Sequence, residues 1–282
     1  MDHPGTGHGE LVFVGTATTL LRFGPFTLLT DPNFLRRGQR AYLGWGLTSK
    51  RLTDPAIAVE DLPELDAVLL SHLHGDHWDR VAEAALDHEL PVLTTPHGGA
   101  YLRRRGFAHA RGLRNWDDVT LAKDGGSVRV TSVPGRHAFG ALGMLLPPVM
   151  GSIVDFLGPS GEVRYRVYVT GDTLMFDGVR EIPERYPDID LLVIHLGGTR
   201  IPAGRALPGA LVTMDGHQGV EFLREIGARH TVPIHYDDYG VFASPLSDFQ
   251  REVAALGFDG LVNCVARGGS LALSAPARHR SG

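Results

Sequence analysis

Cysteine is almost absent from this sequence, since Cys264 is the one cysteine among 282 residues. A single thiol excludes an internal disulfide, so nothing in the composition demands an oxidising compartment. The stretch 260–266 around it is strand-like, which predicts a buried and inert thiol.

We also expect no segment in this sequence that directs or anchors it to a membrane. Residues 1–5 are polar and are not a basic region followed by an apolar one, so no secretory signal is visible and we expect a cytoplasmic location. The longest apolar stretch, 141–157, contains Pro147, Pro148 and Asp155. These residues argue against a membrane-spanning helix.

A large excess of one charge is missing too, because 32 acidic residues against 27 basic ones give a formal net charge of only -5. This balance creates no global field that attracts phosphate backbones, so nucleic acid is not an expected partner. With 43% hydrophobic and 21% charged residues, the composition is that of an ordinary globular protein. The length predicts one domain over 1–282, with the fold proper at about 10–273.

Short β-rich runs and helical patterns alternate along the chain. Runs at 11–14, 18–23 and 26–30, separated by Gly15 and by the turn pair Gly24–Pro25, predict an antiparallel meander. Further strands are predicted at 66–70, 91–94, 127–133, 151–157, 163–170, 189–194, 231–234 and 260–265, and helices at 79–88, 174–186, 215–226 and 247–256. This order favours an α/β fold, an αββα sandwich of two packed mixed sheets with helices on the outer faces.

Four ligand-type side chains crowd into the segment His72-Leu73-His74-Gly75-Asp76-His77, between the predicted strand 66–70 and the helix 79–88. A metal ion relieves this crowding, and imidazole and carboxylate ligands suit zinc, manganese or iron. Histidines two apart on an extended strand end point the same way. A chance cluster in a chain with 14 histidines would not explain the order of strand, cluster and helix.

Three further ligand-type residues each follow a predicted strand: His137, Asp172 and His235. Taken singly, each histidine would more often be a hydrogen-bonded structural residue, and Asp172 a turn residue. The H-x-H-x-D-H segment followed by these residues in this order resembles the metallo-β-lactamase superfamily. The resemblance extends from Gly15 to about Gly269.

The resemblance implies a divided site for two divalent metal ions, Zn²⁺ as the first choice and Mn²⁺ or Fe as alternatives. Its ligands would be His72, His74 and His137 for one ion and Asp76, His77 and His235 for the other, with Asp172 bridging both. Two such ions about 4 Å apart share a hydroxide, which is then the nucleophile.

The opening motifs Gly15-Thr16-Ala17-Thr18 and Leu28-Leu29-Thr30-Asp31-Pro32 are similar to the branch that contains ascorbate-6-phosphate lactonases and N-acyl-phosphatidylethanolamine phospholipases D. This similarity implies hydrolysis of an ester-type bond, a phosphodiester or a lactone, in a small-molecule substrate with an apolar or phosphate-bearing group. Asp at position 172 in place of Cys separates the chain from typical zinc β-lactamases. The alternatives are an iron-dependent oxidoreductase of the dioxygenase type and a binding protein with an inactive site, and a homo-oligomer is left open.

Several acids are candidates for supporting the liganding imidazoles. Asp31, Asp79 and Asp215 are placed for this role in sequence, although Asp31 also fits a turn, and Asp79 and Asp215 also fit helix caps. The candidate catalytic residues are Asp76 and His195. We expect His195 at the mouth of the site as a proton donor or substrate contact, with a core histidine as the alternative.

Two segments next to the predicted ligands are candidates for the substrate pocket. The apolar stretch 138–148 predicts a lid over a hydrophobic substrate, or else an oligomer interface or part of the core. The residues Tyr236, Asp237 and Asp238, directly after His235, either line the pocket or form a polar turn.

Overall fold

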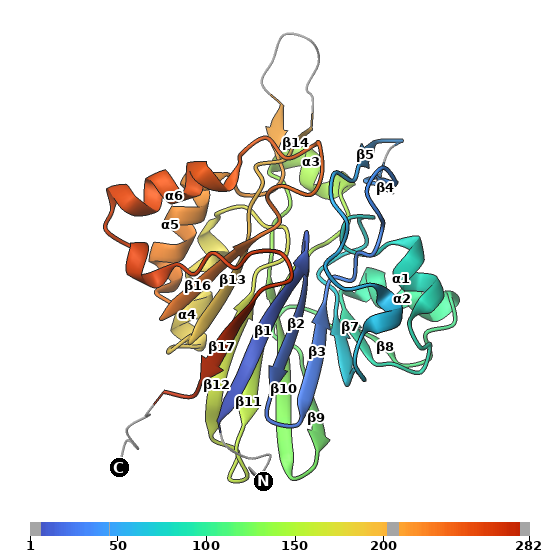
Figure 1. Cartoon of the computed structure of the whole chain (residues 1–282), viewed down its shortest axis with the longest axis vertical. Coiled ribbons are helices and arrows are strands. Elements are labelled where there is room, and N and C mark those ends of the chain that lie inside the picture. The colour runs from blue at the N-terminus through green and yellow to red at the C-terminus, as the bar shows by residue number, and fades with distance from the viewer. Residues whose placement is uncertain (1–6, 45, 202–208, 277–282) are drawn as a thin grey trace.

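The computed structural model describes residues 7–44, 46–201 and 209–276. Two large sheets pack face to face, with helices on the outer side of each (Figure 1). Both sheets mix parallel and antiparallel pairs. The predicted αββα sandwich is therefore confirmed.

The first sheet has the strand order β17-β1-β2-β3-β6-β7-β8. Its first half contains the predicted antiparallel meander, whereas β3, β6, β7 and β8 are parallel to one another. The strands are β1 (His8–Gly15), β2 (Thr18–Phe23), β3 (Phe26–Thr30), β6 (Ala67–Leu69), β7 (Val92–Thr94), β8 (Ala110–Gly112) and β17 (Ser270–Ser274).

The second sheet has the order β16-β13-β12-β11-β10-β9. Its members are β9 (Asp118–Lys123), β10 (Gly126–Pro134), β11 (Met150–Leu157), β12 (Val163–Val169), β13 (Leu191–His195) and β16 (His230–Ile234). Strands β12, β13 and β16 are parallel, so their carboxyl ends lie at the same edge. Two hairpins lie outside the large sheets, β4 (Arg40–Tyr42) with β5 (Thr48–Lys50) and β14 (Arg200–Ile201) with β15 (Ala210–Leu211).

Helices cover both outer faces (Figure 1). The first sheet carries α1 (Arg80–Ala85) and α2 (Pro96–Arg104), and the second carries α4 (Glu181–Arg185), α5 (Gly216–Ile226) and α6 (Leu246–Ala255). The remaining short elements are α3 (Gly140–Leu145) and the 3₁₀ turns η1 (Val59–Asp61), η2 (Asp177–Val179) and η3 (Asp259–Leu261). None of the helices in the described ranges is long and apolar enough to cross a membrane.

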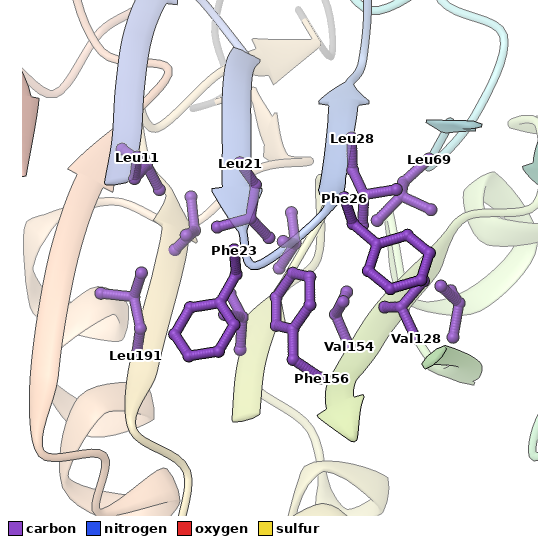
Figure 2. Packing of buried hydrophobic residues seen from close by; sticks show 14 of the residues in the cluster. Leu11, Leu21, Phe23, Phe26, Leu28, Leu69, Val128, Val154, Phe156 and Leu191 are labelled. Carbon is purple, nitrogen blue, oxygen red and sulfur yellow. The ribbon is translucent and has the colours of Figure 1, made fainter. Parts of the chain in front are cut away.

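The main core lies between the sheets. Figure 2 shows Phe23 and Phe26 of the first sheet opposite Val154 and Phe156 of the second. The Phe23 and Phe156 rings are 4.9 Å apart between centroids. Because burying one such side chain stabilises a fold by about 1.5–3 kcal/mol, this layer fixes how the two sheets meet.

One predicted strand is wrong. Residues 260–265 form the end of η3 and an irregular segment, with a single isolated bridge between Thr231 and Val262. The segment lies outside β16, the last strand of its sheet, and is not buried on both sides. Cys264 is consequently exposed, not buried as predicted.

Two helical segments of the structure also differ from the prediction. The segment 174–186 is helical only in η2 and α4. Helix α2 was not predicted, because Gly98 and Gly99 lower helix propensity. These glycines have a packing reason, since a Cβ on Gly99 would lie 2.7 Å from the backbone nitrogen of Gly112 in β8.

Candidate metal centre

The histidine cluster occupies the loop between β6 and α1. In this loop the His77 and Trp78 amides donate to the carbonyl of His74 at 2.9 and 2.8 Å, which closes a tight turn. Gly75 donates to the carbonyl of Tyr42 at 2.8 Å, and a Cβ at Gly75 would lie 2.7 Å from the Tyr42 nitrogen. Glycine is therefore required where the β4–β5 hairpin crosses the cluster.

One half of the site, here called the three-histidine group, consists of His72, His74 and His137. The Nδ1 atom of His74 lies 2.9 Å from Nε2 of His72 and 3.0 Å from Nε2 of His137. Nδ1–H of His137 donates to the carbonyl of Val212 at 2.6 Å, so its Nε2 turns a lone pair toward the group.

Burial keeps these imidazoles neutral. It holds the pKa of His72 well below its ordinary value and lowers the pKa of His137. Burial, with His137 nearby, lowers the pKa of His74 to about 3. Neutral imidazoles whose nitrogens converge on one point are the form that binds a metal ion.

The other half, here called the mixed group, contains Asp76, His77, Asp172 and His235. The Nε2 atom of His77 lies 3.3 Å from Oδ1 of Asp172, and Nε2 of His235 lies 3.5 Å from Oδ2 of Asp76. Potential ligand atoms lie within 4.8 Å of one another in two overlapping sets. One set is His72, His77 and Asp172, and the other is Asp76, His77 and His235. The structure thus brings all the predicted ligands into one continuous cluster.

Charges in the mixed group compensate one another. Burial alone would lower the pKa of His77 and of His235, but the Asp172 carboxylate raises both above the ordinary value. Burial alone would raise the pKa of Asp172, whereas His235 and His77 bring it well below its usual range.

Whether these residues fit metal ions can be judged from the buried ligand-type atoms that make no hydrogen bond to the described residues. Four atoms are buried and have no hydrogen-bond partner within the part of the chain that the structure describes: Nε2 of His77, Nε2 of His235, Oδ1 of Asp76 and Oδ1 of Asp172. Such atoms are costly unless another group satisfies them. Lone pairs of imidazole and carboxylate that face a shared space satisfy the ligand requirements of divalent cations, so the residues fit.

Asp31 supports the mixed group from behind. One of its oxygens accepts from the Ser71 amide at 2.6 Å, and the other accepts from the Ser71 hydroxyl at 2.9 Å and from Nδ1–H of His77 at 3.0 Å. Burial alone would raise its pKa, but His77 and His195 lower the pKa of Asp31 to about 2. A carboxylate that fixes the outer nitrogen of an imidazole in this way leaves the inner nitrogen free to ligate.

Asp79 and Asp215 act as helix caps. Oδ1 of Asp79 accepts from the amides of Val81 and Ala82 at 2.8 Å, while Oδ2 accepts from Phe34 at 2.5 Å. Asp215 caps α5 by accepting from the Gln218 amide at 3.1 Å. Asp215 and Oδ1 of Asp79 thus make the contacts of a cap, whereas Oδ2 of Asp79 holds the loop at residues 33–35.

The expected position of His195 at the mouth is wrong. His195 is fully buried, and its ring stacks on that of His77 with centroids 5.8 Å apart. Its Nε2 lies 3.4 Å from Asp31, and its Nδ1 lies 3.1 Å from the Thr170 hydroxyl. It ends β13, an inner strand of its sheet, and a ring nitrogen of His195 lies within 4.8 Å of ligand-type atoms of Asp31 and His77.

Two segments that adjoin the three-histidine group, one in the chain and one in space, carry exposed apolar side chains. The stretch 138–148 contains α3, which begins at Gly140, three residues after His137. The β4–β5 hairpin approaches His74, since a Cβ on Gly44 would lie 4.0 Å from its Nε2. We call the exposed side chains of these segments the apolar rim: Tyr42, Leu47, Phe139, Met144 and Leu145. Met144 is 82% exposed.

Some supporting residues were not found from sequence. The Thr213 hydroxyl donates to Oδ2 of Asp172 at 3.0 Å, and the Leu196 carbonyl accepts from Nδ1–H of His235 at 3.0 Å. The carbonyl needs no particular side chain, and Thr213 has no sequence motif around it. Among Tyr236, Asp237 and Asp238, the last is fully buried in an ionic network.

An αββα sandwich with a histidine and aspartate cluster at one edge is typical of metallo-β-lactamase-fold proteins. The sequence model of the beta-lactamase superfamily domain matches residues 27–236, so this chain belongs to that superfamily. The predicted family resemblance is confirmed.

Known relatives agree with this assignment. A metal-dependent hydrolase from Rubrobacter xylanophilus is 26% identical over 227 residues, which cover 74% of this chain and 82% of the relative. An isothiocyanate hydrolase from Delia radicum gut bacteria has a similar structure, with a TM-score of 0.78, 20% identity and coverage of 94% and 100% of the two chains. CmlA, a diiron β-hydroxylase from Streptomyces venezuelae, gives a TM-score of 0.64 at 18% identity, over 97% of this chain and 55% of that one.

Proposed function

We propose that this chain is a hydrolase that depends on two divalent metal ions and cleaves an ester-type bond, a phosphodiester or a lactone. One observation carries the proposal: imidazole and carboxylate atoms converge at one edge of the sandwich, and four of them are buried with no hydrogen bond to any described residue. The name of the Rubrobacter xylanophilus relative supports metal-dependent hydrolysis.

The ligand assignment follows the two halves of the cluster. The three-histidine group would hold one ion and Asp76, His77 and His235 the other, with Asp172 shared between them. Zn²⁺ is the ion that this donor set favours first, and Mn²⁺ or Fe are alternatives. When bound, the pair of ions supplies Lewis acidity and lowers the pKa of a water molecule between them.

The protein's own groups orient this centre. His77, His137 and His235 each donate Nδ1–H outward, to Asp31, Val212 and Leu196 respectively, which turns each Nε2 inward. We assign Asp76 a catalytic role. Its Oδ2, beside Nε2 of His235, would be the ligand atom, and its buried Oδ1, which has no hydrogen-bond partner among the described residues, would receive a proton from the attacking water. His195 acts through Asp31, since it is buried and cannot reach solvent.

The apolar rim indicates the substrate class. Met144 and Leu145 are 82% and 57% exposed on α3, and Tyr42 is 59% exposed on the hairpin. Exposed apolar side chains gathered next to a polar centre suit a substrate that has an apolar group beside the cleaved bond. This supports the apolar form of the predicted small-molecule substrate.

The proposal is tested with protein reconstituted with Zn²⁺ or Mn²⁺ and assayed on matched phosphodiesters and lactones with short and long acyl groups. We expect metal-dependent turnover of at least one class, and its loss in His137→Ala and Asp172→Ala. An iron-loaded protein that consumes oxygen with a substrate and hydrolyses none of the panel would establish the oxidoreductase alternative instead.

A further inference from the structure

A buried ionic network lies behind the loop that carries His235. The Arg51 side chain and the Asp238 side chain are both fully buried, and Arg267 is 24% exposed. Arg51 follows the β4–β5 hairpin and Arg267 precedes β17, so segments far apart in sequence meet here. Charged groups are removed from water in a fold only when they pair closely.

Asp238 is the centre of this network. Its Oδ2 atom accepts from the Thr16 amide at 2.6 Å. Its Oδ1 atom accepts from the Thr53 hydroxyl, and it lies 3.0 Å from Arg267 Nη2 and 3.8 Å from Arg51 Nη2. The carboxylate is thus held by cationic and neutral donors on one side and holds the backbone of Thr16 on the other.

Thr16 connects Asp238 to a candidate metal ligand. The Thr16 carbonyl accepts from the His235 amide at 2.9 Å. Both residues have backbone angles in the left-handed region, with φ of 54° at Thr16 and 65° at His235. Residues other than glycine adopt this conformation only where surrounding contacts impose it. The hydrogen bonds from Asp238 to Thr16 and from Thr16 to His235 are such contacts.

Arg51 extends the network to the histidine cluster. Its Nη1 donates to the backbone carbonyl of Asn33 at 3.1 Å and to the Asn33 side-chain oxygen. The Nδ2 atom of the Asn33 side chain in turn donates to the Gly75 carbonyl at 2.9 Å. A Cβ on Gly15 would lie 3.1 Å from Arg51 Nη2 and 3.3 Å from Arg267 Nε, so both arginines pack against the residue before Thr16. The loops that carry His235 and the histidine cluster are therefore fixed to the same guanidinium.

We propose that Asp238, held by Arg51 and Arg267, is a positioning residue that fixes His235 through Thr16 and thereby sets the metal affinity of the mixed group. The inference rests on the proposed metal centre. It requires no contact between Asp238 and the metal ion, because the effect passes through two backbone hydrogen bonds. Residues that hydrogen-bond a liganding imidazole directly change metal affinity by about 10–100-fold when they are replaced, and Asp238 acts one residue further away, so we expect the lower end of that range.

The chain provides a matched control in Asp237. It pairs with the same Arg267 nitrogen at 2.9 Å, but its side chain is 51% exposed. Comparing Asp238→Ala with Asp237→Ala therefore separates loss of the hydrogen bond to Thr16 from loss of a partner for Arg267. The variant Asp238→Asn keeps an oxygen that can accept from the Thr16 amide.

The test is a Zn²⁺ competition titration with a chromophoric chelator, which measures the two binding steps separately. For Asp238→Ala we expect one step to weaken by about 10-fold or more and the other to stay unchanged. Asp238→Asn should fall between this variant and the parent, and Asp237→Ala should match the parent. Thr53→Val, which removes one donor to Asp238, gives a smaller loss in the same step and is the variant used if Asp238→Ala does not fold.

Two results would overturn the inference. In the first, the Asp238 variants, or Thr53→Val in their place, bind both ions as tightly as the parent. In the second, both steps weaken equally, as they would if the network only stabilised the fold. If the parent itself binds no metal, the proposed function fails together with this inference, whereas a parent that binds two ions leaves the proposed function intact.

Discussion

Replacing Asp31 with asparagine tests how the protein orients His77. Every group that faces the Asp31 carboxylate is a donor or can be one: the Ser71 amide at 2.6 Å on one oxygen, and the Ser71 hydroxyl, His77 and His195 on the other. A carboxylate accepts on both sides, whereas an amide must place its NH₂ group against donors on one side.

The size of the effect follows from these contacts. With the oxygen of the introduced amide turned toward His77, its NH₂ group would face the Ser71 amide and leave one buried donor unsatisfied, which costs about 1–3 kcal/mol. The opposite orientation leaves more donors unsatisfied and costs more. We therefore expect Asp31→Asn to lower the free energy of unfolding of the metal-free protein by about 1–3 kcal/mol. Metal affinity should fall about 10–100-fold, because Nδ1–H of His77 would then donate to a neutral amide oxygen, which fixes the ring less strongly than a carboxylate.

The assay combines urea unfolding of the metal-free protein with chelator competition for Zn²⁺. Asp215→Asn is the matched control, because Asp215 caps α5 through the Gln218 amide and an asparagine caps equally well. It should leave both measured quantities unchanged. The reasoning is refuted if Asp31→Asn binds Zn²⁺ like the parent, or if the control weakens binding as much.

Three further predictions concern stability, substrate and pH. Asp79→Ala removes the cap of α1 and the acceptor for the Phe34 and Leu35 amides. Urea unfolding should therefore show a free energy of unfolding lower by about 3–5 kcal/mol, and a decrease below about 1 kcal/mol would contradict this role. Met144→Ser with Leu145→Ser should raise KM for long-acyl substrates but not for short ones, and equal effects on both would exclude the apolar rim from substrate binding. The raised pKa values of His77 and His235 stabilise the metal-free protein below about pH 6.5, and this stability is lost as the pH rises. The lowered pKa values in the three-histidine group have the opposite effect, because they destabilise the protein as the pH falls below about 6.5. Urea unfolding at several pH values should therefore show that the site contributes most to the free energy of unfolding near about pH 6.5. Zn²⁺ affinity should still rise above that pH, and a Zn²⁺ affinity that falls between about pH 6.5 and 8 would contradict these pKa shifts.

The fold was predictable because its strands are short apolar runs between turn residues. The meander around Gly24–Pro25 and the later βα alternation define the two mixed sheets. Helix α2 was not predicted because Gly98 and Gly99 lower helix propensity, although they allow close packing against Thr94 of β7 and Gly112 of β8 respectively. The stretch 260–265 has strand composition but lies beyond the last paired strand of its sheet, and composition does not reveal edge position.

The predicted ligands could be found because each follows a strand end, and the strand ends meet at one edge. The surroundings of the site depend on pairs that lie far apart in the chain. Asp238 reaches Thr16 across 222 residues, and no local pattern marks that contact. The depth of His195 depends on β13 lying between β12 and β16, which is a property of topology and not of the residues around it.

The central claim is a centre for two metal ions that performs hydrolysis. It is tested most directly by the metal content per chain of protein purified without added metal and then reconstituted, determined by elemental analysis together with turnover of the phosphodiester and lactone panel. We expect two Zn²⁺ or Mn²⁺ ions per chain and hydrolysis of one substrate class. A single iron ion per chain with oxygen consumption and no hydrolysis would contradict it.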